Sequence, residues 1–159
     1  MLTKQIAKQN ALEYLRAHDV GVVATIDTEG QPFVSPVYYA AGANFGIFFL
    51  TTSGTRKSQN IMNNERVAFS VGSGPEYIAV TIRGKAILAE GNEYDKGLAL
   101  IKDKAENNSM LNWPIKRLDE LKKHQLYLYK IEPKEVTFLN IDSSDEPESI
   151  ADYLYELLP

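Results

Sequence analysis

The first eighteen residues carry apolar side chains at the spacing of an amphipathic helix. The apolar positions of this stretch are Ile6, Ala7, Ala11, Leu12 and Leu15. Their spacing predicts a helix over residues 3–18, with Thr3 placed to cap its first turn. From residue 20 the period shortens, and runs of β-branched and aromatic residues, separated by turn residues, replace the helical pattern.

Seven of these apolar runs have the length and composition of strands, and they lie at residues 20–26, 33–40, 45–51, 67–72, 77–89, 126–131 and 135–141. Further helices are expected at residues 55–64, 94–107, 115–123 and 150–158. This order predicts a mainly β fold with α, a small closed or nearly closed antiparallel β-barrel with flanking helices. The 159 residues suit a single domain over 1–159, in which residues 142–159 form a polar linker and a C-terminal helix.

Three breaks in the strand pattern carry structural information. Pro36 lies inside the second run and predicts an edge, a bulge or a place where the ladder opens, because proline has no N–H to donate. Gly84 lies inside the fifth run and predicts a bulge or a bend at a barrel corner. Residues 132–134 (Glu-Pro-Lys) predict a turn between the last two strands.

Composition and charge narrow the function classes. The net charge of −4 argues against a nucleic-acid partner, because such proteins carry a basic field. The absence of cysteine excludes disulfides, thiolate zinc sites and a cysteine nucleophile, and two histidines make a metal site unexpected. No run approaches the roughly 20 apolar residues of a membrane helix, and the N-terminus does not resemble a targeting segment. We expect a soluble, cytoplasmic protein with no membrane partner.

Residues 48–60 carry the clearest chemical signal. An apolar strand ends in a cluster of hydroxyl residues and a glycine, and Arg56 and Lys57 then occupy the first turn of the expected helix. Cations are unfavourable at a helix N-terminus unless an anion lies there. Free N–H groups, hydroxyls and two cations together suit a phosphate. The alternative is an ordinary helix start whose cations point into water, and neither a GxxxxGK[ST] nor a GxGxxG motif is present.

The chain resembles the flavin-binding split barrels of the pyridoxamine 5′-phosphate oxidase-like superfamily. The resemblance covers roughly residues 9–140 and rests on the order and spacing of several blocks together. These blocks are Val22-Val23-Ala24-Thr25-Ile26-Asp27 with Gly30-Gln31-Pro32, Ser35-Pro36-Val37-Tyr38, Phe49-Leu50-Thr51-Thr52 with Thr55-Arg56-Lys57 and Asn60-Ile61, Asn64-Glu65-Arg66-Val67-Ala68-Phe69, and Val80-Thr81-Ile82-Arg83-Gly84-Lys85-Ala86.

This resemblance implies a split barrel that binds flavin mononucleotide (FMN) at a homodimer interface. By position, Arg56 and Lys57 would hold the phosphate, Asn60 would lie near it, and Thr51 and Thr52 would contact the phosphate and the ribityl chain. The residues expected to line the isoalloxazine ring with backbone groups are Ser35, Pro36, Val37 and Tyr38. A second subunit would complete the site, with residues 77–83 or the segment after helix 94–107.

Several residues near this expected site have more than one possible role. Trp113 would either reach the flavin of the partner or fill an apolar subunit contact. Tyr38 and Tyr39 are adjacent on a strand, so at most one of them can face the site. No general base or nucleophile stands out, which suits a flavin enzyme because the cofactor carries the electron chemistry. The catalytic residues are therefore left unassigned.

The sequence departs from true pyridoxamine 5′-phosphate oxidases. No arginine follows Arg117, although those enzymes end in an arginine-bearing motif, and Ser35 stands where they carry an arginine. Oxidation of vitamin B6 is therefore not expected, and the chain is more similar to the small general-stress-type branch.

The leading hypothesis is an FMN-dependent oxidoreductase that passes electrons from a reduced nicotinamide to an unknown small molecule. The alternatives are a deazaflavin-dependent reductase, a non-catalytic flavin or heme binder or redox sensor, and a structural dimer with a degenerate site.

Overall fold

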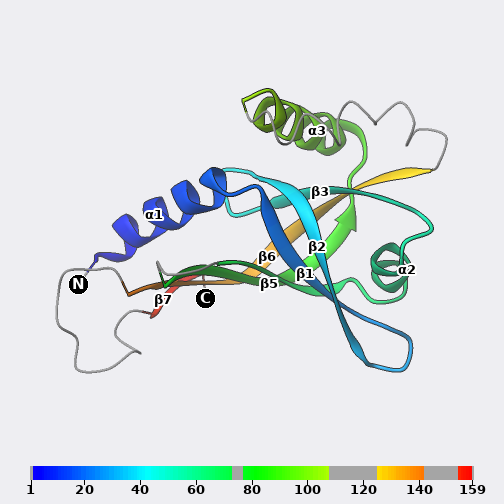
Figure 1. The fold of residues 1–159 in the computed structure, drawn as a ribbon, viewed down its shortest axis with the longest axis horizontal. Coiled ribbons are helices and arrows are strands. Elements are labelled where there is room, and N and C mark those ends of the chain that lie inside the picture. Colours follow the sequence, from blue (N-terminus) through cyan, green and yellow to red (C-terminus); the bar gives the residue numbers. More distant parts are fainter. Residues whose placement is uncertain (1, 73–76, 108–124, 142–153, 159) are drawn as a thin grey trace.

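The computed structural model describes residues 2–72, 77–107, 125–141 and 154–158, and these form a β-barrel with helices around it (Figure 1). The helices are α1 (Lys4–Ala17), α2 (Arg56–Asn63) and α3 (Gly91–Glu106). The strands are β1 (Val20–Ile26), β2 (Pro32–Ala41), β3 (Ile47–Thr52), β4 (Arg66–Gly72), β5 (Ile78–Leu88), β6 (Leu126–Asn140) and β7 (Leu154–Leu158). No helix of these described ranges has the length and apolarity needed to cross a membrane.

The sheet is antiparallel and closes on itself. Its strand order is β3-β2-β1-β4-β5-β6-β7, and a further pairing between β3 and β6 joins the two ends into a barrel of six strands, with β7 added at the edge of β6. Closure leaves few unpaired strand edges, which protects a sheet from edge-to-edge association. The predicted antiparallel barrel with flanking helices is confirmed.

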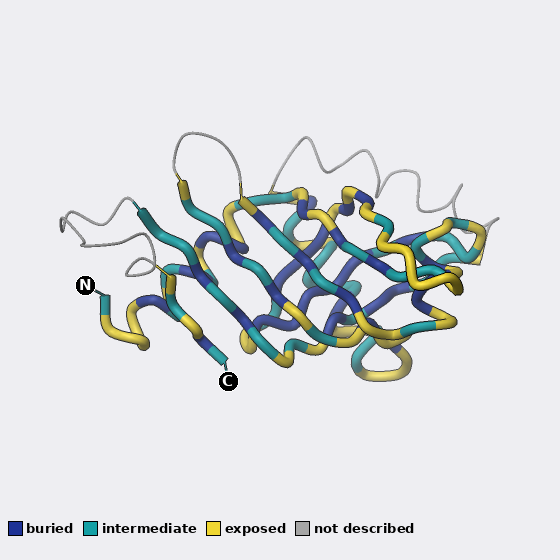
Figure 2. Tube along the Cα trace, turned by 90° about the horizontal axis from the view of Figure 1, so that it is seen from below, coloured by how far each residue is buried: buried dark blue, intermediate teal, exposed yellow. Residues whose placement is uncertain are grey.

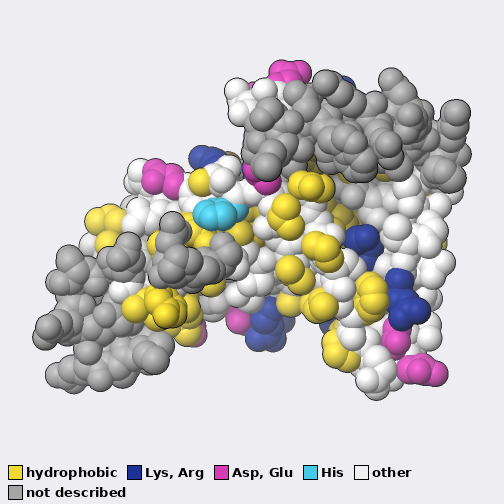
Figure 3. Space-filling view, viewed as in Figure 1, with side chains coloured by type: hydrophobic (Ala, Val, Ile, Leu, Met, Phe, Trp, Pro, Cys, Tyr) yellow, Lys and Arg dark blue, Asp and Glu magenta, His cyan; other side chains and the backbone are white. Residues whose placement is uncertain are grey.

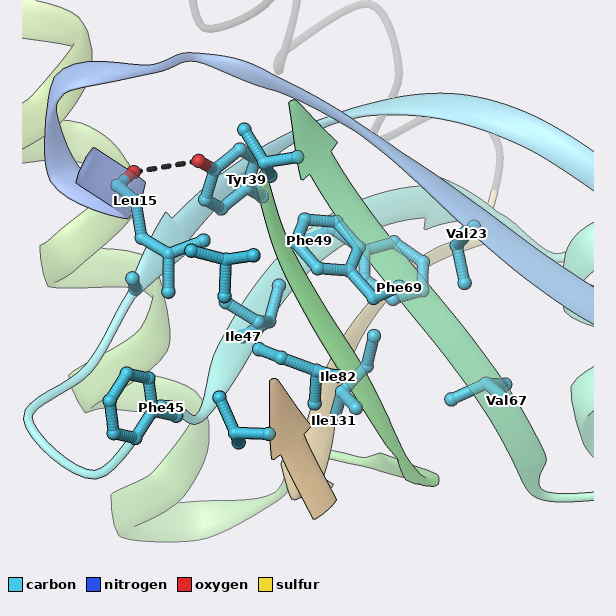
Figure 4. Packing of buried hydrophobic residues seen from close by; sticks show 14 of the residues in the cluster. Leu15, Val23, Tyr39, Phe45, Ile47, Phe49, Val67, Phe69, Ile82 and Ile131 are labelled. Carbon is cyan, nitrogen blue, oxygen red and sulfur yellow. Dashed lines mark hydrogen bonds between the residues drawn. The ribbon is translucent and has the colours of Figure 1, made fainter. Parts of the chain in front are cut away.

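The barrel interior is the hydrophobic core. Buried and more exposed residues alternate along β1 and β4, and the stripes of Figure 2 follow this alternation. Phe49, Phe69 and Ile82 are completely buried and lie close together inside the barrel (Figure 4). The core also reaches α1, because the Tyr39 hydroxyl donates a hydrogen bond to the Leu15 carbonyl over 2.7 Å.

The partly buried Lys104 side chain connects helix α3 to the end of α1. The Lys104 ammonium donates to the carbonyl oxygens of Leu15 and His18, and it lies 4.1 Å from the centre of the Tyr39 ring. These carbonyls belong to the C-terminal end of α1, where helix carbonyls lack partners within the helix. Burial lowers the pKa of Lys104 to about 8, although the charge of Asp19 opposes this effect.

Two predicted elements near the C-terminus are wrong, and the predicted helix over 115–123 lies outside the described residues. The expected turn at residues 132–134 is absent because β6 runs unbroken from Leu126 to Asn140. Pro133 lies opposite Gly84 at a register shift, where the ladder can tolerate a missing N–H. Residues 154–158, expected in the C-terminal helix, form strand β7 instead. They pair with the free edge of β6, and this pairing buries Leu157.

Gly84 confirms the predicted bulge and is the first residue that we would substitute. The β5–β6 register shifts between Arg83 and Gly84, and a Cβ at position 84 would lie 2.0 Å from the Glu132 carbonyl oxygen. We expect Gly84→Ala to lower the free energy of unfolding by about 2–4 kcal/mol, measured by urea denaturation. Gly54→Ala is the control, since a Cβ there has open space and should change stability by less than about 0.5 kcal/mol. An unchanged urea concentration at the unfolding midpoint of Gly84→Ala would contradict this account of the bulge.

Candidate functional site

The barrel opens where β2 and β3 separate. These strands pair over three residue pairs, from Tyr39–Phe49 to Ala41–Ile47. After Phe49, β3 pairs only with β6 in the described part of the chain, as far as Thr52. Before Tyr39, residues 32–38 of β2 pair only with β1 within the same described ranges. Over residues 32–38, one edge of β2 therefore has no ladder partner among the described strands.

The backbone groups at this open edge follow from strand alternation. The Tyr39 N–H donates toward β1, to the Asp19 carbonyl oxygen, whereas the Gly42 N–H donates toward β3, to the Gly46 oxygen. Because successive backbone groups of an antiparallel strand point to opposite sides, those of Pro36 and Tyr38 face the open edge. Pro36 thus costs no ladder hydrogen bond, and its predicted role as an opening of the ladder is confirmed.

A tight turn of threonines connects β3 to α2 beside this opening. The Thr55 hydroxyl donates to the Thr52 carbonyl over 3.0 Å and accepts from the Ser58 N–H, so Thr55 caps α2. The Thr51 and Thr55 hydroxyl oxygens lie 2.9 Å apart. Since the Thr55 proton already points to Thr52, Thr51 is the donor of this pair. These side chains fix the start of the helix.

Arg56 and Lys57 occupy the first turn of α2, as predicted, and this turn holds no acidic residue. Within the described ranges, neither cation forms an ion pair with a carboxylate. Arg56 is exposed, and its guanidinium carbon lies 5.2 Å from the centre of the Phe33 ring. Partial burial lowers the pKa of Lys57, because removing water disfavours the charged ammonium. An anion at this helix end would offset both the dipole and the burial penalty.

Asn60 lies one turn further along α2 but faces the barrel interior. It is 6% exposed, and its side-chain amide donates to the Thr25 hydroxyl over 3.0 Å. Ser58 is fully buried beside it on the helix, and its hydroxyl lies 3.1 Å from the Tyr129 hydroxyl. Helix α2 therefore closes this end of the barrel through polar contacts to β1 and β6.

The remaining predicted residues divide between the two faces of β2. Ser35 and Val37 are buried and point into the barrel, whereas Pro36 and Tyr38 are exposed on the outer face. Tyr39 is buried, and its hydroxyl bonds to α1, so Tyr38 is the tyrosine of this pair that can face a ligand. Trp113 lies outside the described residues.

The residues brought together fit a phosphate-bearing ligand. Two cations without carboxylate partners among the described residues lie at a capped helix N-terminus, next to a strand edge with backbone groups to offer. In contrast, no group of three or more His, Asp or Glu side chains in the described ranges could hold a metal ion. The contact of Phe33 with Arg56 and the hydrogen bond between Asn60 and Thr25 were not predicted from the sequence. Contacts between a hairpin and a helix distant in sequence leave no local pattern.

Comparisons with known proteins identify the family of this chain. The family model described as pyridoxamine 5′-phosphate oxidase matches residues 7–140. Over 86 residues the chain is 35% identical to the 5a,11a-dehydrotetracycline/5a,11a-dehydrooxytetracycline reductase of Streptomyces rimosus subsp. rimosus, an alignment that covers 49% of this chain and 61% of the reductase.

Solved structures share the fold at low sequence identity. A heme binding protein from Mycobacterium smegmatis is 19% identical with a TM-score of 0.67, covering 92% of this chain and 59% of its own. An FAD binding protein from the same organism is 17% identical with a TM-score of 0.54, covering 82% of this chain and 91% of its own. The family model spans the barrel, the threonine turn and α2. The chain therefore belongs to the pyridoxamine 5′-phosphate oxidase family.

Proposed function

We propose that this protein binds FMN and transfers electrons from a reduced nicotinamide to a small acceptor. The observation that carries the proposal is the pair Arg56 and Lys57, which lack carboxylate partners among the described residues, at the start of α2 beside the open edge of β2. Family membership supports it, as do two similar proteins described as a reductase and as an FAD binding protein. FMN is the member of the flavin group that ends in a single phosphate, which suits one short cationic turn.

Each part of the site has a role in this proposal. Arg56 offers a planar fork of N–H donors and Lys57 a point charge, and together they would hold the phosphate. The backbone groups of Pro36 and Tyr38 at the edge of β2 would bind polar atoms of the ring, while Thr52 would contact the ribityl chain. The bound flavin supplies the redox chemistry, and this chain supplies binding and orientation.

We further propose that two copies of the chain share the site across an apolar face on β1 and β2. This apolar face consists of Val20, Val22, Val34, Pro36 and Tyr38. Its valines are 42–63% exposed, and Figure 3 shows apolar side chains gathered over these strands, with Lys and Arg side chains near α2. The face adjoins the open edge, because Pro36 and Tyr38 belong to both. A second copy that covers it would shield the ring from water.

The second candidate is a non-catalytic binder of heme, which the similarity to the M. smegmatis heme binding protein favours. A heme needs an axial ligand, most often histidine. Of the two histidines, His18 lies within the described residues, and its Nδ1 is 2.8 Å from the Tyr14 carbonyl oxygen at the end of α1. His18 caps the C-terminal end of α1 and is not part of the cationic turn of α2, so we place heme second.

The catalytic part of the proposal is tested with protein loaded with FMN. We expect NADPH or NADH to bleach the visible flavin absorbance under anaerobic conditions, and air or an added acceptor to restore it. Free FMN at the same concentration is the control. A bound flavin that neither nicotinamide reduces faster than free FMN would contradict the oxidoreductase and leave a flavin carrier.

A further inference from the structure

The β1–β2 hairpin extends past the barrel at the end where α2 lies (Figure 1). Its turn is well defined, because the Asp27 carboxylate accepts hydrogen bonds from the N–H groups of Glu29 and Gln31, over 3.0 and 2.8 Å. Gly30 has a φ of 82°, which favours glycine, and completes the turn. The hairpin therefore holds Phe33 in a fixed place near α2.

Two contacts join this hairpin to α2. The first is the Phe33 ring, whose centre lies 5.2 Å from the guanidinium carbon of Arg56. The second is a buried relay in which the Asn60 amide donates to the Thr25 hydroxyl over 3.0 Å, and that hydroxyl donates to the Phe33 carbonyl over 3.4 Å. Thr25 is completely buried and Asn60 nearly so, which shields the hydrogen bond between them from water.

The two contacts act on one face of the helix. Arg56 and Asn60 are four residues apart, so their side chains lie one above the other on α2. Both contacts end on Phe33, one at its ring and one at its carbonyl. Together they connect the hairpin to α2 at two points, one at Arg56 in its first turn and one at Asn60. A cation–π contact occupies the guanidinium without a carboxylate partner, so the N–H donors of Arg56 remain available to an anion.

We propose that Phe33, Thr25 and Asn60 are positioning residues that orient the Arg56 guanidinium toward the FMN phosphate. This inference rests on the proposed function, because it assigns these residues to the same site. Asn60 then acts from the barrel interior through Thr25 instead of touching the ligand. An arginine held in this way loses less side-chain freedom when the phosphate binds, so affinity for the phosphate rises.

The test compares FMN with riboflavin, which has the same ring without the phosphate, by flavin fluorescence titration. We expect Phe33→Leu to weaken FMN binding about fivefold, the range of a cation–π contact near the surface, and to leave riboflavin binding unchanged. Phe33→Tyr keeps an aromatic face and should bind FMN like the wild type. Thr25→Val should also weaken FMN selectively, because it removes the hydroxyl of the relay. In an Arg56→Ala background, Phe33→Leu should cause no further loss.

The remaining outcomes separate this inference from the proposed function. Equal losses for FMN and riboflavin in Phe33→Leu would overturn it, since a structural defect weakens both ligands. Unchanged FMN binding would also overturn it, as would a full additional loss in the Arg56→Ala background. If Arg56→Ala weakens FMN binding but Phe33→Leu does not, the positioning role is overturned and the proposed function stands. A wild-type protein that binds neither flavin overturns the proposed function and the positioning role together. Thermal unfolding of each variant verifies that it is folded.

Discussion

Replacing both Arg56 and Lys57 by alanine is expected to abolish FMN retention while the barrel stays folded. A hydrogen bond to a charged group contributes about 1.5–3 kcal/mol, so losing two such residues should weaken FMN binding by roughly 10²–10⁴-fold. Arg56 is exposed and Lys57 half-buried, and neither pairs with a described carboxylate, so the fold should lose little. Equilibrium dialysis against FMN measures the loss.

The matched control removes two positive charges elsewhere. Lys96 and Lys102 are both exposed on α3, so the double variant Lys96→Ala/Lys102→Ala changes the net charge equally. We expect it to keep FMN. Retention of FMN by the Arg56→Ala/Lys57→Ala protein would show that the phosphate lies elsewhere, and an equal loss in the control would show that only the overall charge matters.

A charge placed in the apolar face is expected to separate the proposed dimer. Val22 and Val34 are 42% and 63% exposed on neighbouring strands of that face. If a second copy covers them, Val22→Lys/Val34→Lys would bury two unpaired charges on each subunit. We expect the dissociation constant to rise by more than roughly 100-fold, because each such charge costs several kcal/mol. Sedimentation velocity at micromolar concentration measures this shift.

The same variant should also lose FMN, because we propose that a second copy of the chain completes the site. Ile6→Lys is the control, since Ile6 is similarly exposed but lies on α1, away from the apolar face. We expect this control to remain dimeric and to keep FMN. A wild-type protein that sediments as a monomer, or a double variant that remains a dimer, would contradict the proposed interface.

The strands of the barrel were predictable where local pattern and tertiary pairing agree. The strand predicted at residues 20–26 is β1 with the same bounds, and Gly84 does mark a bulge. Prediction failed where pairing overrides local preference. Pro133 is a turn former by sequence, yet a register shift accommodates it inside β6, and the residues of β7 have a helical pattern but meet the free edge of that strand.

The candidate site was predictable to the extent that its signal is local. Arg56 and Lys57 stand out because cations are unfavourable in the first turn of a helix. Pro36 stands out because proline cannot donate a hydrogen bond to a neighbouring strand. The contact of Phe33 with Arg56 and the hydrogen bond from Asn60 to Thr25 join residues 23 and 35 positions apart. Such contacts depend on how the hairpin packs against α2, which one sequence does not reveal.

The most direct test of the central claim is the visible absorption spectrum of the purified protein, taken before and after it is mixed with FMN and the excess removed by gel filtration. The site at the start of α2 predicts a retained flavin spectrum, stoichiometric with the chain and absent from the Arg56→Ala/Lys57→Ala variant. A colourless protein that cannot be loaded would contradict the assignment of this site to FMN.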